Sequence, residues 1–151
     1  MKTITQQPES MDILSKKGTC IEFFSAYQDF DLDRMLSLCS PTGEVHFEPM
    51  GAAGKGKIHE TGKAIWAALM DSFPNLDNTV KSQTFNEADN SVSCVVTIFG
   101  KQEKAFAEIP SKGNEFDSDH IFIFRFNEEG KITNLKVSWD HERFVKQLTG
   151  A

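Results

Sequence analysis

The dominant hydrophobic period of this chain changes at Pro74. Before Pro74 the apolar residues recur at intervals of three, four and seven, which gives a helix one buried face. After Pro74 they recur at every second position, as on a strand with one buried face. Helices followed by an antiparallel meander are typical of an α+β domain, in which the helices cover one face of the sheet.

Three helices are expected in the first half of the chain. The first spans residues 11–28, and Asp31 is a suitable N-cap for a short second helix. The segment 40–43, Ser-Pro-Thr-Gly, is expected to end this second helix and to lead into a strand at residues 44–48. Thr61 is expected to cap the third helix.

The second half is expected to form an antiparallel meander. Apolar residues alternate from Val92 to Ile98, and a longer strand follows from Asn114 to Phe126. The sequence Asn127-Glu128-Glu129-Gly130 predicts a hairpin turn into a strand at residues 131–139. Asp140 is then a suitable N-cap for a last helix.

Length and charge narrow the class of protein. With 151 residues, 39 % of them hydrophobic, the chain is the size of one domain, which we place at residues 11–151 after a disordered polar tail at residues 1–10. A net charge of −6 argues against nucleic acid as a partner. No apolar run approaches the roughly 20 residues of a membrane span, and the N-terminus lacks the apolar core of a signal peptide. We expect a cytoplasmic protein without a membrane partner.

The cysteines and aromatic residues predict a dry interior. Cys20, Cys39 and Cys94 lie in separate apolar segments, which favours buried core residues over a disulfide framework or a zinc site. Phe occurs 13 times and Tyr once, so most of the aromatic surface carries no polar atom. We therefore expect an interior lined by Phe, with no metal ion and no cofactor.

The stretch GAAGKGKI, residues 51–58, is similar to the phosphate-binding loop G-x-x-x-x-G-K-[ST], but Ile58 stands where a hydroxyl would bind Mg²⁺. Such a loop also joins a buried parallel strand directly to a helix. Here the helix is expected only at Thr61, and the later strands lack the alternation of strands and helices in a nucleotide-binding fold. We interpret the stretch as a flexible connection from a strand to a helix, at the lip of a pocket.

The order of the predicted elements resembles that of the SnoaL-like polyketide cyclases, which belong to the nuclear transport factor 2 superfamily. The resemblance covers residues 11–149, and it implies a cone-shaped α+β roll in which a curved antiparallel sheet wraps around N-terminal helices. It also implies a homodimer with one deep apolar pocket for a small hydrophobic or ring-shaped ligand. The segments that carry the resemblance are IEFFSAYQDFDLDRMLSLC, EVHFEP, TGKAIWAALMDSFPNL, IPSKG and DHIFIFRFNEEGKITNLKVSWD.

The catalytic residues of these families are matched only in part. Glu48 occupies the position at which ketosteroid isomerases have a proton-shuttling carboxylate, but Phe23 and Phe122 replace their two oxyanion donors. Losing one such donor typically costs about 3–4 kcal/mol, which argues against steroid isomerisation. The SnoaL cyclases have an acid–base aspartate and a histidine at the positions of Val137 and Phe122 in this chain.

Strand alternation predicts which polar side chains face the pocket. If Phe122 points inward, so does His120, and His46 shares a face of its strand with Glu48. Desolvation among phenyl rings would raise the pKa of Glu48 toward the range of a general base, so Glu48 is the candidate base, with His46 or His120 as its partner. The expected ligand-binding residues are Phe23, Tyr27, Trp66, Phe122, Phe124, Val137 and Trp139.

Several alternatives stay open at this level. The chain is either a cofactor-free isomerase, cyclase or dehydratase, or a ligand-binding accessory module without catalysis. A third class, a protein-docking domain, is disfavoured because no distinct docking face is marked in the sequence. Glu48 is either a base or a solvated side chain at the pocket rim, and a metal site of His46, Glu48 and His120 lacks a supporting motif. Since both faces of several strands are apolar, a second copy of the chain is expected to cover the outer face of the sheet.

Overall fold

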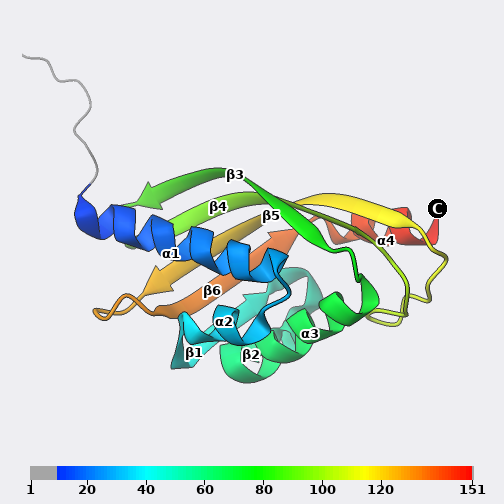
Figure 1. The fold of residues 1–151 in the computed structure, drawn as a ribbon, viewed down its shortest axis with the longest axis horizontal. Helices are drawn as coiled ribbons and strands as arrows, with labels where there is room; N and C mark the ends of the chain where they lie inside the picture. Colours follow the sequence, from blue (N-terminus) through cyan, green and yellow to red (C-terminus); the bar gives the residue numbers. More distant parts are fainter. Residues whose placement is uncertain (1–9, 151) are drawn as a thin grey trace, which may run out of the picture.

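The computed structural model of the protein describes residues 10–150 and contains one six-stranded, strongly curved sheet (Figure 1). The strand order is β2-β1-β6-β5-β4-β3. Neighbouring strands are antiparallel, except for β1 and β6, which run parallel. The strands are β1 (Cys39–Phe47), β2 (Lys55–Lys57), β3 (Asp77–Asn86), β4 (Ser91–Lys101), β5 (Glu115–Phe126) and β6 (Ile132–Trp139).

The first three helices lie on one side of this sheet. α1 (Met11–Gln28) contacts β3 and β4, and α2 (Leu32–Ser37) contacts both α1 and α3 (Lys63–Ser72) (Figure 1). α4 (His141–Thr149) packs against β5 near the C-terminus of the chain. The α+β fold expected from the sequence, a curved sheet around N-terminal helices, is confirmed.

Side-chain caps begin three of the helices. Asp31 accepts a hydrogen bond from the backbone N–H of Arg34, and Asp140 accepts one from Arg143, as predicted. Ser10 caps α1, although the sequence analysis assigned it to the polar tail. The expected cap at Thr61 is wrong, because a π-helical turn, η2 (Ile58–Gly62), continues directly into α3 without a side-chain cap.

The region between α2 and α3 is more ordered than its composition indicates. Residues 40–43 lie inside β1, where the pairing with β6 changes register, rather than in a break before the strand. A short 3-10 helix, η1 (Glu48–Gly54), follows, and Lys55–Lys57 pairs with β1. The stretch interpreted as a flexible connection is therefore partly an edge strand, and strand β3 was not predicted as a separate element.

Aromatic rings of α1 and β5 form the centre of the core. Phe24 packs edge-on against Phe122 and Phe124, and Phe23 packs in the same way against Phe124, with ring centroids 4.9–5.8 Å apart. Such pairs contribute about 0.5–1.5 kcal/mol each beyond the apolar area that they bury. These contacts hold α1 against the sheet. The three cysteines are all buried, as predicted.

The expected disordered tail, apart from Ser10, falls on residues 1–9, which lie outside the described part of the chain, as does Ala151. The single-domain boundary at residues 11–151 stays a prediction. Within residues 10–150, no helix is long and apolar enough to cross a membrane. The cytoplasmic location also stays a prediction.

Candidate functional site

An apolar cavity lies between the helices and the sheet. Its free volume is about 40 Å³, which has room for about three water molecules, whereas a drug-sized ligand fills roughly 300 Å³ or more. A ligand of that size therefore enters only if lining side chains move. The cavity is lined by Tyr27, Phe47, Met50, Ile65, Trp66, Leu69, Ile98, Phe106, Phe116, His120, Phe122, Val137, Trp139 and Phe144.

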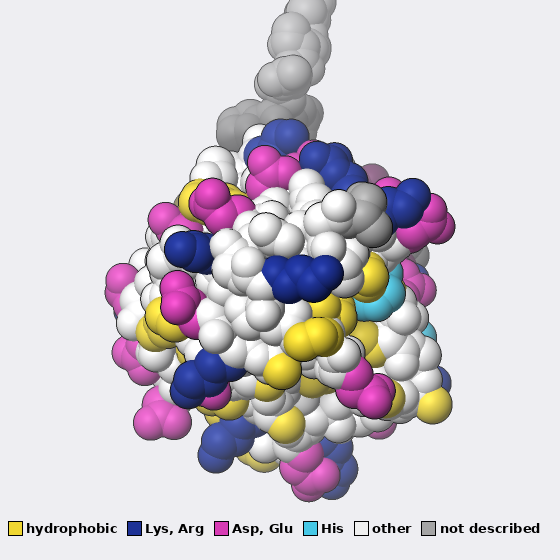
Figure 2. Space-filling model, turned by 90° about the vertical axis from the view of Figure 1, so that its right-hand side faces the viewer, with side chains coloured by type: hydrophobic (Ala, Val, Ile, Leu, Met, Phe, Trp, Pro, Cys, Tyr) yellow, Lys and Arg dark blue, Asp and Glu magenta, His cyan; other side chains and the backbone are white. Residues whose placement is uncertain are grey.

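The cavity presents very little charge to a ligand. Among the described residues, its lining includes no Asp, Glu, Lys or Arg, and its polar side chains are those of His120, Tyr27 and Trp139. On the face of the molecule near the C-terminus, hydrophobic side chains gather among scattered acidic and basic ones (Figure 2). A neutral, mainly apolar ligand suits such a lining, because a charged group would lose its hydration without gaining a partner of opposite charge.

His120 is a buried polar group of the cavity with a shifted pKa. Its side chain is buried in β5, and Nδ1 lies 3.0 Å from the carbonyl oxygen of Ser118. A carbonyl oxygen only accepts hydrogen bonds, so Nδ1 carries the proton and Nε2 carries the lone pair. Burial lowers the pKa of His120 to about 4, so the imidazole is neutral at pH 7.

Tyr27, at the end of α1, supplies a hydrogen-bond donor to the same cavity. Its hydroxyl has no hydrogen-bond partner within residues 10–150, and burial raises the pKa of the phenol well above its usual range. The hydroxyl therefore stays protonated at physiological pH and can donate to a ligand.

Tyr27 and His120 line the same cavity, and the packing of α1 on β5 explains this placement. Phe24 contacts Phe122, and Tyr27 lies one helical turn beyond Phe24. His120 lies two residues before Phe122 on the same face of β5. One helical turn rises about 5.4 Å, and two strand residues span about 6.6 Å. Tyr27 and His120 are therefore displaced by similar distances from the contact between Phe24 and Phe122.

Trp139 lines the cavity as predicted, but its indole N–H is already bonded. The N–H donates to Nδ1 of His141 across 3.3 Å. The indole face stacks on the imidazole of His120, with centroids 5.2 Å apart and an interplanar angle of 21°. Trp139 therefore offers a ligand its apolar surface. His141 itself is half-buried.

His46 and Glu48 do not line the cavity, which corrects the expected orientation of the first strand. Val45 and Phe47 are the buried side chains of β1, because they align with the buried Leu135 and Val137 of the parallel strand β6. Glu48 begins η1 with its side chain 42 % exposed, and its Oε2 lies 4.0 Å from Nζ of Lys136.

The predicted ligand-binding residues divide into two groups. Tyr27, Trp66, Phe122, Val137 and Trp139 line the cavity. Phe23 and Phe124 are fully buried in the core beside it, where their rings pack against each other. The three candidates for acid–base chemistry are not brought together, because only His120 lies at the cavity.

Sequence reasoning placed Phe116 on the inward face of β5 but did not assign Phe106 and Phe144 to the cavity. The rings of Phe106, Phe116 and Phe144 all pack against Phe73, and Phe116 also packs against Phe144. Phe106 lies in a loop, Phe116 in β5 and Phe144 in α4. Phe116 was predictable from its inward alternation along β5, and the available signal for Phe144 was its apolar position on the last helix. Phe106 gave no signal, because it lies in a loop that has no hydrophobic period.

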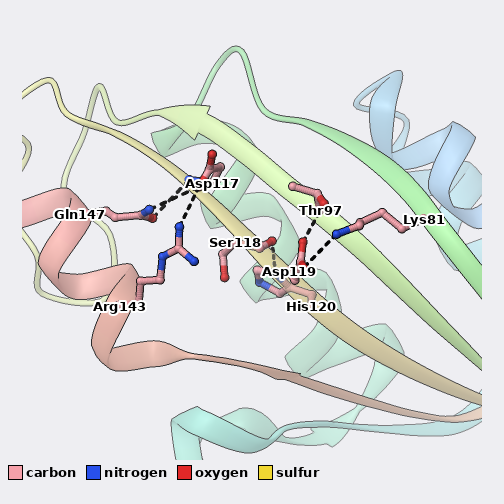
Figure 3. A network of polar contacts seen from close by, with 8 residues as sticks. All are labelled: Lys81, Thr97, Asp117, Ser118, Asp119, His120, Arg143 and Gln147. Atoms are coloured by element: carbon pink, nitrogen blue, oxygen red, sulfur yellow. Dashed lines mark hydrogen bonds and ion pairs between the residues drawn. The ribbon is translucent and has the colours of Figure 1, made fainter.

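The two faces of β5 carry different chemistry (Figure 3). Ser118 and His120 are buried, whereas Asp117 and Asp119 point to the outer side. Hydrogen bonds from Thr97 and Lys81 lower the pKa of Asp119. The carboxylates of β5 therefore lie on the side of the sheet that faces away from the cavity.

Comparison with known proteins gives a family for this arrangement. The sequence profile of the SnoaL-like domain matches residues 21–135. The Austinoid biosynthesis cluster protein H of Aspergillus calidoustus is 30 % identical over 118 residues, which cover 76 % of this chain and 75 % of that protein.

Solved structures share the fold over most of the chain. A SnoaL-like protein from Jannaschia sp. CCS1 has a TM-score of 0.82 at 21 % identity, covering 97 % of this chain and 99 % of its own. TsrD from Streptomyces laurentii has a TM-score of 0.77 at 22 % identity, covering 94 % and 100 %. AusH from Aspergillus nidulans has a TM-score of 0.68 at 21 % identity, covering 88 % and 87 %.

Proposed function

This chain belongs to the SnoaL-like domain family, and from that premise we propose that its cavity binds a small neutral molecule on which His120 moves a proton without a cofactor. The ligand class is hydrophobic and ring-shaped. The observation that carries the proposal is the neutral imidazole of His120, whose Nδ1 is engaged by Ser118 and whose Nε2 is left for a ligand.

In the proposed reaction, the proton that leaves one ligand atom returns to another, so no external acid or base is consumed. Nε2 of His120 takes a proton from a carbon next to a ligand carbonyl, and the hydroxyl of Tyr27 donates to the carbonyl oxygen as negative charge develops there. The proton then returns to another ligand atom. An isomerisation or a ring closure of this type oxidises and reduces nothing, so it requires no redox cofactor.

The relatives support a role in small-molecule biosynthesis. The curated relative is named for an austinoid biosynthesis cluster, and the family matched by the sequence profile is SnoaL-like. These names describe those proteins. For this chain they favour a cyclase-type role over a protein-docking role.

A ligand-binding module without catalysis is the second candidate. It is favoured by the pKa of His120, since a value of about 4 lies well below the neutral range in which a general base works best. In this alternative, Nε2 of His120 and the hydroxyl of Tyr27 only hold a ligand.

Binding is tested with three matched probes: 1-naphthol, naphthalene and 1-naphthoate. One hydrogen bond from the naphthol hydroxyl to Nε2 should favour 1-naphthol over naphthalene roughly fivefold. This preference should vanish in His120→Phe, and 1-naphthoate should bind least because the cavity offers its charge no partner. Equal affinities of wild type and His120→Phe for 1-naphthol would contradict the role of His120.

Catalysis is tested by the exchange of the protons next to the carbonyl of 1-tetralone in D₂O, followed by NMR. We expect exchange above the buffer rate in the wild type, slower exchange in Tyr27→Phe and none above the buffer rate in His120→Phe. Binding of the ketone without any enzymatic exchange would favour the non-catalytic module.

Glu48 is the base expected from the sequence, and that role stays a prediction. The same exchange assay separates the two candidates, because Glu48→Gln keeps the size of the side chain and removes its charge. If His120 is the base, Glu48→Gln exchanges at the wild-type rate. A loss in Glu48→Gln alone would instead restore the role predicted from the sequence.

We also propose that the chain forms a homodimer through the outer face of the sheet. The proposal is supported by apolar side chains on that face. Ile121 is 42 % exposed, and the neighbouring Val95 and Ile123 are only partly buried. A second copy would remove these side chains from water.

A further inference from the structure

We propose that His141 is a positioning residue for the cavity, which holds the indole of Trp139 flat against the imidazole of His120. The proposal rests on the proposed role of His120 and extends it by one residue, since His141 itself is not part of the cavity lining.

The chain of contacts begins at the indole nitrogen. The N–H of Trp139 can only donate a hydrogen bond, so Nδ1 of His141, 3.3 Å away, must present its lone pair. His141 is thereby fixed in the tautomer with its proton on Nε2. The tautomer of His120 is the reverse, because its Nδ1 donates to Ser118.

The indole faces His120 because the two residues are paired across strands. His120 of β5 lies directly opposite Trp139 of β6 in the antiparallel ladder. Their rings stack at 5.2 Å, so the position of the indole determines how one face of the imidazole is covered.

His141 is itself held in place from two directions. Asp140 caps the first turn of α4, which fixes the backbone of the residue that follows it. The ring of His141 stacks on Phe144, a cavity residue, with centroids 5.8 Å apart and an interplanar angle of 24°. The acceptor for the indole N–H therefore has a fixed position on α4, the helix that contributes Phe144 to the cavity lining.

Removal of the acceptor, Nδ1 of His141, would favour a different orientation of the indole. A half-buried N–H without a partner is costly, so the ring would turn to find water or another acceptor. Turning would take the indole off His120 and change a cavity whose free volume is only about 40 Å³. The stacking contact would then no longer cover one face of His120, and the hydrogen bond from Nδ1 to Ser118 alone would orient Nε2.

Two substitutions separate the acceptor from the bulk of the side chain. His141→Phe keeps an aromatic ring to stack on Phe144 but removes the acceptor. His141→Asn is smaller but offers an amide oxygen to the indole N–H. A purely structural role for the ring predicts that the Phe variant is the milder change, whereas positioning through the hydrogen bond predicts the opposite.

The readout is NMR of the free protein, with the indole N–H groups and the ring nitrogens of His120 labelled with ¹⁵N. Trp66 and Trp139 are the two tryptophans, and Trp139→Phe assigns their signals. We expect the Trp139 N–H to exchange with solvent at least tenfold faster in His141→Phe than in the wild type, with altered shifts of the His120 nitrogens. His141→Asn should stay close to the wild type, and an unchanged Trp66 signal reports an intact core.

Unchanged exchange and unchanged His120 shifts in His141→Phe would overturn the proposal, as would equal effects of the Phe and Asn variants. No ligand is needed for these measurements. A failure of the proposed function would appear elsewhere, as naphthol binding that is insensitive to His120→Phe.

Discussion

At the level of single residues, His120 makes the stability of the fold depend on pH. Its pKa is about 4 in the folded protein and about 6.5 in the unfolded chain. Between these values the unfolded chain binds a proton that the folded protein does not, so stability is complete above about pH 6.5 and falls as the pH drops toward 4. The loss amounts to about 3 kcal/mol, since each pKa unit corresponds to about 1.4 kcal/mol.

Urea unfolding of the wild type and His120→Phe across this range measures the effect. Phe suits a row that already contains Phe116, Phe122 and Phe124 on the same face of β5. We expect the difference in unfolding free energy between the two proteins to change by about 3 kcal/mol between pH 7 and pH 4. A constant difference would show that His120 titrates normally in the folded protein.

The sequence predicts the inward position of His120 correctly, but it does not predict the positions of His46 and Glu48. Alternation along β5 follows from a strict period of two, so the inward position of His120 could be read directly. The first strand has one register break and a parallel partner, and there the alternation alone assigned His46 and Glu48 to the wrong side. Only the pairing of Val45 with Leu135 decides which side of β1 is buried.

At the scale of elements, Asp140 connects the sheet to α4 and thereby holds the end of the cavity. Its side chain accepts from the backbone N–H of Arg143, so Asp140→Ala should destabilise the protein by about 1 kcal/mol. Asp140→Asn keeps an accepting oxygen and should cost much less. Thermal or urea unfolding checks both, and equal losses in the two variants would contradict a capping role.

The loop that carries Phe106 stores backbone strain. Ala107 and Glu108 have φ of 49° and 66°, the left-handed region that costs a residue with a Cβ atom roughly 1–2 kcal/mol. Relief of that strain outweighs the extra freedom of glycine in the unfolded chain, so Ala107→Gly should stabilise the protein by about 0.5–1 kcal/mol.

Ala105 provides the matched control for this prediction, because it lies in the same loop and has no positive φ. Ala105→Gly should destabilise the protein by about 0.4–1 kcal/mol, since there glycine only adds freedom to the unfolded chain. Urea unfolding of the two variants should therefore give changes of opposite sign. Changes of the same sign would contradict the strain at Ala107.

Helices and hairpins were predictable because their signals are local. Asp31 and Asp140 act as the expected caps, and the turn ending at Gly130 joins β5 to β6. The π-helical turn η2 and the edge strand β2 were not predictable, because both depend on packing against β1 rather than on their own propensities. A segment with three glycines carries little local preference for any element.

At the scale of the whole molecule, the proposed dimer makes the outer face of the sheet a buried interface. Ile121→Lys places a charge at its centre and should convert the dimer to a monomer in light scattering, with the fold retained. Lys81→Ala, on the same face within the charged network, should leave the dimer intact. A wild type that is monomeric at every practical concentration would contradict the proposed interface.

In the proposed function, the cavity takes a small neutral molecule whose hydroxyl donates to Nε2 of His120. The most direct test is the ¹⁵N shift of the His120 ring nitrogens during titration with 1-naphthol. We predict that Nε2 moves toward the shift of a hydrogen-bonded acceptor, while Nδ1, engaged by Ser118, stays nearly constant. An Nε2 signal that does not change up to the solubility limit of 1-naphthol would contradict the claim.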